Sequence, residues 1–154
     1  MTNTRTVVLS FLASTALAHF DIEFPEQKQP ADENGLSSGP CGGAELDFDA
    51  GPVNDFHVGG NTVQLAPSHP SAHWLFRVTT DTKGEGNWTQ AYPILQQNGL
   101  GDLCIPLVTA PEDFVGKKGL LGVVADSDDG VLYGVSCLDV SHGIRTQHTH
   151  YQIC

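Results

Sequence analysis

The apolar residues of this chain recur with the two-residue period of a β-strand, and no long segment has a helical period. Residues 20–24 and 74–79 alternate apolar with other side chains, as expected of strands with one buried face. Asp129-Gly130 is typical of a hairpin turn, and 17 glycines and 9 prolines interrupt the chain. The pattern predicts an all-β fold, either a sandwich or a barrel. Shorter apolar runs that fit further strands occupy residues 62–66, 103–108 and 120–125.

The first 18 residues have the features of a secretory signal peptide. Arg5 precedes a short apolar run, and Ala16-Leu17-Ala18 matches an A-x-A cleavage site. Cleavage there makes His19 the first residue of the mature chain, where it offers a metal both its α-amine and a ring nitrogen. A second histidine would complete a T-shaped set of three nitrogens, which suits the tetragonal preference of Cu(II). Chance is the alternative, because seven of the 154 residues are histidine.

Length and charge indicate a single acidic domain. Removal of residues 1–18 leaves enough sequence for one domain with its own core. The net charge of −11 argues against nucleic acid and anionic membranes as partners and favours cations. The apolar run before Ala18 is too short to cross a bilayer, and the C-terminus lacks the pattern of a lipid-anchor signal. We therefore expect a secreted protein.

Cysteine content and one glycosylation sequon agree with export. Secreted proteins normally oxidise their cysteines to disulfides. The sequence does not choose among the three possible pairings of Cys41, Cys104, Cys137 and Cys154. Asn87-Trp88-Thr89 is an N-glycosylation sequon in a glycine-rich stretch, which indicates an exposed loop and a glycoprotein.

Two histidines are candidates for the second metal ligand. His69 lies in the loop Pro67-Ser68-His69-Pro70, and His73 begins the strand that follows. A loop histidine beside proline is easier to hold at the edge of the domain than one within a strand, so we favour His69. The alternative is that His69 is only a solvated side chain, as single loop histidines often are. His148-Thr149-His150 is more typical of weak, adventitious metal binding in a tail.

Other chemical motifs are weak or missing. The turn Asp126-Ser127-Asp128-Asp129-Gly130 holds three carboxylates, but it lacks the spacing and the distal glutamate of an EF-hand. We interpret it as a solvated turn. The chain contains neither G-x-S-x-G nor H-E-x-x-H, so the sequence carries no hydrolase signature.

Several short motifs occur in an order that resembles a known family. They are His19-Phe20, Pro40-Cys41-Gly42-Gly43, Ser68-His69-Pro70 with Trp74-Leu75-Phe76-Arg77, Gly86-Asn87-Trp88-Thr89, Gly99-Leu100-Gly101-Asp102-Leu103-Cys104 and Asp129-Gly130-Val131-Leu132-Tyr133. Each is weak alone, but their order resembles the fungal copper-acquisition-factor (Bim-type) family, which is related to lytic polysaccharide monooxygenases. The resemblance covers residues 19–133.

This resemblance implies an immunoglobulin-like β-sandwich with a histidine brace on its surface. One copper ion would be held by the amine and ring of His19, by a second histidine, which the motif match assigns to His69, and by an aspartate. Family members are reported to bind copper without cleaving polysaccharides, and some take part in copper uptake. Many are tethered to the cell surface by a GPI anchor. The implied partners are copper itself and a copper transporter at the cell surface.

The chain departs from the family pattern after Tyr133. We predict a signal peptide over residues 1–18, a copper-binding domain over 19–133 and an atypical tail over 134–154, without an anchor signal. In one interpretation, residues 137–140 form the last strand of the domain, displaced along the sequence. In the other, residues 134–150 are translated from an unspliced intron and do not belong to the domain. The sequence does not decide between these two interpretations. The carboxylate ligand that we predict, on the expected last strand, is Asp139; Asp126 is the alternative.

The sequence is compatible with three functions. The first is a secreted or cell-surface copper-binding protein that acts in copper acquisition or handling without catalysis, because a carboxylate ligand favours Cu(II) and suits handover. The second is a copper-dependent lytic polysaccharide monooxygenase, which needs an exposed aromatic platform. Only Trp88 offers one, since Trp74 fits the core, and contact with glycans is left open. The third is a structural β-sandwich that binds no metal.

Overall fold

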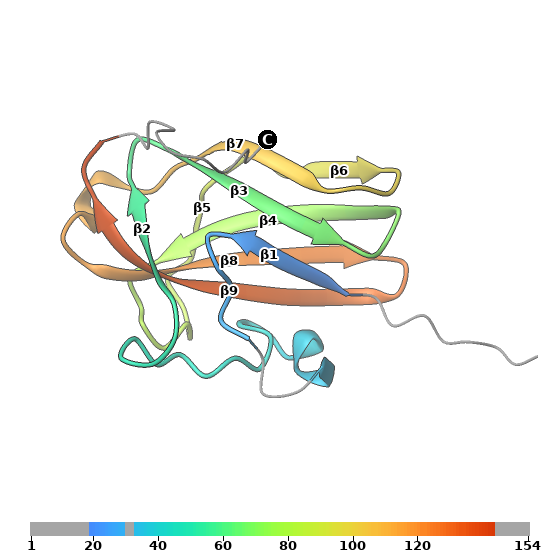
Figure 1. Ribbon diagram of the computed structural model, residues 1–154, viewed down its shortest axis with the longest axis horizontal. Coiled ribbons are helices and arrows are strands. Elements are labelled where there is room, and N and C mark those ends of the chain that lie inside the picture. Colours follow the sequence, from blue (N-terminus) through green and yellow to red (C-terminus); the bar gives the residue numbers. More distant parts are fainter. Residues whose placement is uncertain (1–18, 30–32, 144–154) are drawn as a thin grey trace, which may run out of the picture.

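Nine strands and two short 3-10 helices make up the part of the chain that the computed structural model describes, residues 19–29 and 33–143 (Figure 1). The predicted signal peptide, His148 and His150 lie outside these residues. No helix among them is long and apolar enough to cross a membrane. The elements are β1 (Phe20–Phe24), η1 (Glu33–Ser37), β2 (Val53–His57), β3 (Asn61–Pro67), β4 (Ser71–Thr79), β5 (Thr89–Gln90), β6 (Leu95–Asn98), β7 (Leu103–Val108), η2 (Glu112–Phe114), β8 (Lys118–Ser127) and β9 (Gly130–Ser141).

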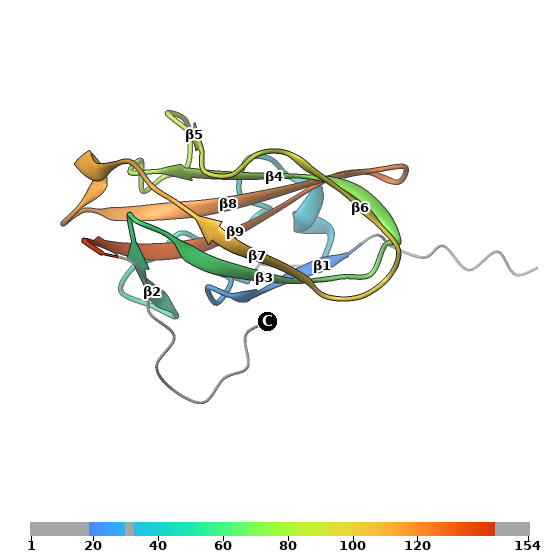
Figure 2. The same cartoon turned by 90° about the horizontal axis from the view of Figure 1, so that it is seen from above.

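The strands form a two-layered β-sandwich, which confirms the predicted fold class. A three-stranded sheet in the order β1-β3-β7 covers a six-stranded sheet in the order β2-β9-β8-β4-β5, in which β6 also pairs with β4. Figure 2 shows the two layers edge on, with β6 and β7 leading the chain from one sheet to the other. The strand β2 was not predicted, because only two of its five residues are strongly apolar. It pairs in parallel with β9.

The core lies between the layers and follows the predicted alternation. In β4, Ala72, Trp74, Phe76 and Val78 are buried, whereas the residues between them are more exposed. Phe20 of β1 meets Trp74 edge to face with ring centroids 5.1 Å apart, so this contact joins the two sheets. Burial of a large apolar side chain stabilises a fold by about 1.5–3 kcal/mol. The contact therefore anchors the start of β1 on the larger sheet.

The strand β9 is buried on both faces, so its sequence does not alternate. Leu138 and Val140 belong to the core between the sheets, while Val135 and Cys137 pack into a second cluster on the outer side of the larger sheet. Both sets are fully or almost fully buried. The domain boundary predicted at residue 133 therefore falls inside a continuous strand, and the structure describes the segment 137–140 as part of that last strand.

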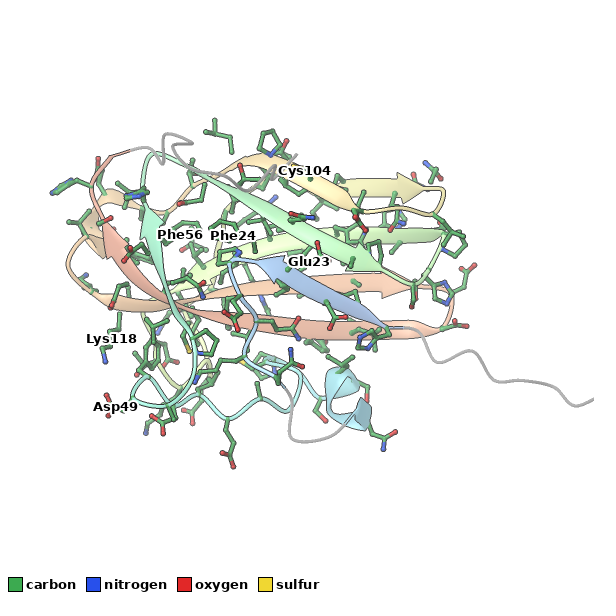
Figure 3. All side chains as sticks on the ribbon, viewed as in Figure 1. Glu23, Phe24, Asp49, Phe56, Cys104 and Lys118 are labelled. Atoms are coloured by element: carbon green, nitrogen blue, oxygen red, sulfur yellow. The ribbon has the colours of Figure 1, made fainter. Side chains whose placement is uncertain are left out.

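The second cluster holds two of the four cysteines. Cys41 and Cys137 are both buried there with Leu120, and their thiols are free in this structure. Burial raises the pKa of the Cys41 thiol and of the Cys137 thiol. The predicted disulfides stay a prediction, and Cys154 lies outside the described residues. Side chains over the whole described chain are drawn in Figure 3.

We predict that the reduced protein loses stability as pH rises above about 8.5, where an unfolded cysteine ionises. The folded thiols of Cys41 and Cys137 resist ionisation, so above that pH the unfolded state binds fewer protons than the folded state, and the free energy of unfolding falls. Denaturant titrations between pH 7 and 9.5 with reductant present measure this slope. The double variant Cys41→Ala/Cys137→Ala should have a shallower slope; equal slopes would contradict the assignment.

Candidate metal centre

The main chain of His19 is held at the end of the sandwich by Ser68. Phe20 of β1 pairs with Pro67 of β3, so His19 comes to lie opposite Ser68 in the loop between β3 and β4. Its main-chain nitrogen donates to the hydroxyl of Ser68 at 2.9 Å. The amide and the hydroxyl of Ser68 donate to the carbonyl oxygen of His19, at 2.9 Å and 2.7 Å. Ser68 therefore holds both the main-chain nitrogen and the carbonyl oxygen of His19.

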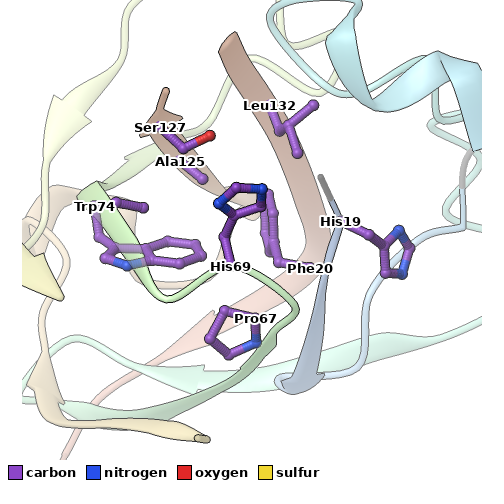
Figure 4. A pocket seen from close by; sticks show the side chains of 9 residues that line it. His19, Phe20, Pro67, His69, Trp74, Ala125, Ser127 and Leu132 are labelled. Atoms are coloured by element: carbon purple, nitrogen blue, oxygen red, sulfur yellow. The ribbon is translucent and has the colours of Figure 1, made fainter. Parts of the chain in front are cut away.

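His69 follows Ser68 directly, so the same loop brings the second histidine to the same place. Both histidines line one pocket, together with Phe20, Pro67, Ala72, Trp74, Ala125, Ser127 and Leu132. Figure 4 shows the His69 ring between Trp74 and Leu132. The remaining side chains that line the pocket are mostly apolar, so the pocket has an apolar floor. The structure therefore brings the two predicted histidines together.

A carboxylate completes this group from a third segment. The Nε2 atom of His69 contacts the Oδ2 atom of Asp129, which lies in the tight turn between β8 and β9. The side chain of His69 is 25% exposed and that of Asp129 is 46% exposed. The Nε2 nitrogen of the His69 imidazole therefore lies beside an anionic oxygen.

The ring of His19 is turned away from His69. Its Nε2 atom lies 3.1 Å from the Oδ2 atom of Asp21, and both side chains are nearly half exposed. Successive strand residues point to opposite faces, so the buried Phe20 directs its neighbours His19 and Asp21 outward together. Figure 4 shows the ring of His19 pointing away from the pocket. Exposed side chains change rotamer within nanoseconds, so the ring of His19 is not locked in this direction.

The structure does not bring Asp139 to the two histidines, which corrects our choice of carboxylate. Asp139 pairs with Lys118 at the far end of the β8–β9 hairpin. It lies ten residues along an extended strand from Asp129, about 30 Å at the usual rise of a strand. The Nζ atom of Lys118 lies 4.0 Å from the Oδ1 atom of Asp49, and both residues are labelled in Figure 3. This ion pair marks the end of the sandwich opposite the pocket.

Asp126 and His73 lie beside the pocket, but on the face of the larger sheet that points away from it. They are direct cross-strand neighbours in β8 and β4, and both are exposed. The residues flanking Asp126, Ala125 and Ser127, line the pocket. Because neighbouring strand residues face opposite ways, Asp126 points away from it. The same reasoning applies to His73, whose neighbours Ala72 and Trp74 line the pocket.

The available donors fit copper only when the main-chain nitrogen of His19 is counted. Among the described residues, no three histidine, cysteine, aspartate or glutamate side chains gather closely enough to hold a metal. The candidate set instead combines the main-chain nitrogen and ring of His19, the ring of His69 and the carboxylate of Asp129. Three nitrogens and a hard oxygen are donors that Cu(II) accepts.

Sequence reasoning missed Asp129 and Ser68 for different reasons. Asp129 belongs to the acidic turn, which we interpreted as solvated, and only the register of the β8–β9 hairpin shows that this turn reaches the loop of His69. Ser68 appeared only as a neighbour of His69. The pairing of β1 with β3 places the hydroxyl group of Ser68 directly opposite His19. A hydroxyl-bearing residue beside His69 was the available sign of this role in the sequence.

Comparison with known proteins gives consistent matches. The chain is 28% identical over 142 residues to the lytic polysaccharide monooxygenase-like protein X325 of Yarrowia lipolytica, a match covering 86% of this chain and 52% of that protein. The chain thus spans about half the length of this curated relative. A lytic polysaccharide monooxygenase from Jonesia denitrificans, solved by neutron crystallography, matches with a TM-score of 0.52 at 14% identity, over 80% of this chain and 100% of that chain. This second match concerns the fold alone.

The family model described as copper acquisition factor BIM1-like matches residues 17–153. The match includes β9 and both histidines of the pocket, so it extends past the boundary that we predicted at residue 133. Together with the sandwich and the grouping of His19 with His69, it confirms the family suspected from the sequence motifs. The chain belongs to the copper acquisition factor BIM1-like family.

Proposed function

We propose that this protein binds one Cu(II) ion outside the cell and serves copper acquisition or handling without catalysing a reaction. The observation that carries the proposal is the convergence of His19, His69 and Asp129 from three segments at one end of the sandwich. Removal of residues 1–18 would convert the main-chain nitrogen of His19 into an amine. That amine, the ring of His19 and the ring of His69 would then supply the three nitrogens of a histidine brace.

Each residue has a defined part in this proposal. Ser68 holds the main chain of His19, so the terminal nitrogen would stay near the pocket after cleavage. The apolar floor of Phe20 and Trp74 limits water on the inner side. Asp129 would add an anionic oxygen, which favours Cu(II) over Cu(I). Affinity should fall as pH decreases, because the amine and the coordinating nitrogen of each ring must be unprotonated to bind metal.

Binding rather than catalysis is favoured by the hard oxygen donor, which disfavours reduction of the ion. The family description, copper acquisition factor, points the same way. A polysaccharide-cleaving enzyme is expected to have an exposed aromatic platform, and this feature gains little support. Arg77 lies over the ring of Trp88, with its guanidinium carbon 4.4 Å from the ring centroid, so one face of the indole is covered. Trp88 is only partly exposed. A copper transporter remains the partner that we propose for handover at the cell surface.

Replacement of His69 should weaken copper binding strongly. His69→Ala removes a nitrogen donor, and even the loss of an outer partner of a metal ligand costs about 10- to 100-fold in affinity. We expect a decrease of more than about 100-fold in Cu(II) affinity for the protein that starts at His19, measured by competitive titration. His73→Ala is the matched control and should bind as the wild type does. Equal losses in the two variants would contradict the assignment.

The two aspartates can be separated in the same assay. Asp129→Asn keeps the shape of the side chain but removes its charge, so we expect roughly a tenfold or greater loss of Cu(II) affinity and a changed electron paramagnetic resonance spectrum. Asp139→Asn, at the other end of β9, should change neither. A spectrum altered by Asp139→Asn alone would restore our first choice of ligand.

The monooxygenase alternative has its own test. Copper-loaded protein is incubated with a reductant, peroxide or oxygen, and a panel of insoluble polysaccharides, and the soluble products are analysed by mass spectrometry. We expect no oxidised oligosaccharides above a metal-free control. Their release in a copper-dependent manner would show catalysis and overturn the non-catalytic proposal while leaving the copper site intact.

A further inference from the structure

A buried glutamine links the floor of the pocket to the loop that carries His69. Gln97 of β6 is only 4% exposed, and it pairs with Ala72 of β4. Its Oε1 atom accepts the indole N–H of Trp74 at 3.0 Å. Its Nε2 atom donates to the carbonyl oxygens of His69 and Gly99, each at 2.8 Å. One side chain thus joins Trp74 in the floor of the pocket to the loop of His69 and to the loop that follows β6.

The orientation of this amide follows from its partners. The indole of Trp74 can only donate a hydrogen bond, so the oxygen of Gln97 must face it. The nitrogen must then face the two carbonyl oxygens, and its two hydrogens are both used. No other neutral side chain of this length offers one acceptor and two donors in this arrangement. Glutamine is therefore specified at residue 97 by its hydrogen-bonding partners.

The loops on either side are also tied directly to each other. The amide of Gly99 donates to the carbonyl oxygen of Pro70 at 2.7 Å. Gly99 has a φ of +109°, a conformation that favours glycine, so this loop can bring its amide to that carbonyl. The segment 69–70 is consequently held from the inner side by Gln97 and Gly99, whereas Ser68 contacts His19.

We propose that Gln97 is a positioning residue for His69, an inference that rests on the copper-binding function proposed above. By fixing the carbonyl of His69 and the indole of Trp74 together, Gln97 sets the position from which the imidazole reaches Asp129. Fixed ligands bind a metal more tightly than mobile ones, because less conformational freedom is lost on binding. The role of Gln97 is distinct from general packing, since its exposed neighbour Gln96 has no such contacts among those described.

The test compares Gln97→Met with Gln96→Met. Methionine has a similar length and adapts to the available space, but it makes none of the three hydrogen bonds. In the protein that starts at His19, we expect Gln97→Met to lower Cu(II) affinity by about 10- to 100-fold and to broaden the electron paramagnetic resonance spectrum. In the metal-free protein, the His69 ring and the Trp74 indole N–H should shift or split in NMR spectra. Gln96→Met should leave all of these unchanged.

The outcomes separate this inference from the proposed function. If wild-type protein binds no Cu(II), the function fails, and the metal-free NMR signals of His69 still decide the role of Gln97. If Gln97→Met lowers only the melting temperature and leaves affinity and the His69 signals as in the wild type, the positioning role is wrong. Should Gln97→Met not fold, Gln97→Glu replaces it. An ionised carboxylate cannot donate to both carbonyls, so the same changes are expected.

Discussion

The candidate site depends on the antiparallel pairing of β1 with β3. This pairing sets Phe20 against Pro67, and it therefore brings the residue before β1 into contact with the residue after β3. Three hydrogen bonds between His19 and Ser68 close the end of the ladder. Because His69 is the next residue, a single register places both histidines at one pocket. A slip of one residue would reverse every side chain of β1 and expose Phe20.

Packing beneath the pocket makes that register stable and supports the site. Phe20 and Trp74 meet edge to face across the two sheets, and both are almost completely buried. The indole N–H of Trp74 needs an acceptor in this apolar setting, since an unpaired buried donor costs about 1–3 kcal/mol. Gln97 meets that need and holds the His69 loop at the same time. The core and the candidate metal centre therefore share residues.

Sequence alone predicted the parts of the structure that depend on local pattern. Alternation predicted β1 and β4, and the cleavage site and the loop prolines singled out His19 and His69. Long-range register could not be predicted: it places Asp129 beside His69 and Asp139 about 30 Å away along β9. β2 was missed because a short parallel edge strand with three polar residues among its five has no clear periodicity. The segment after Tyr133 did not alternate because β9 is buried on both faces.

The central claim is that the main-chain nitrogen of His19 becomes a copper ligand once the preceding residues are removed. The direct measurement is a Cu(II) titration, with electron paramagnetic resonance, of protein that starts at His19 and of protein that carries one extra residue before it. We predict about one tightly bound ion for the first protein. For the second we predict an affinity lower by more than about 100-fold, because the nitrogen of His19 is an amide there and a poor donor. Equal affinities and identical spectra would contradict the claim.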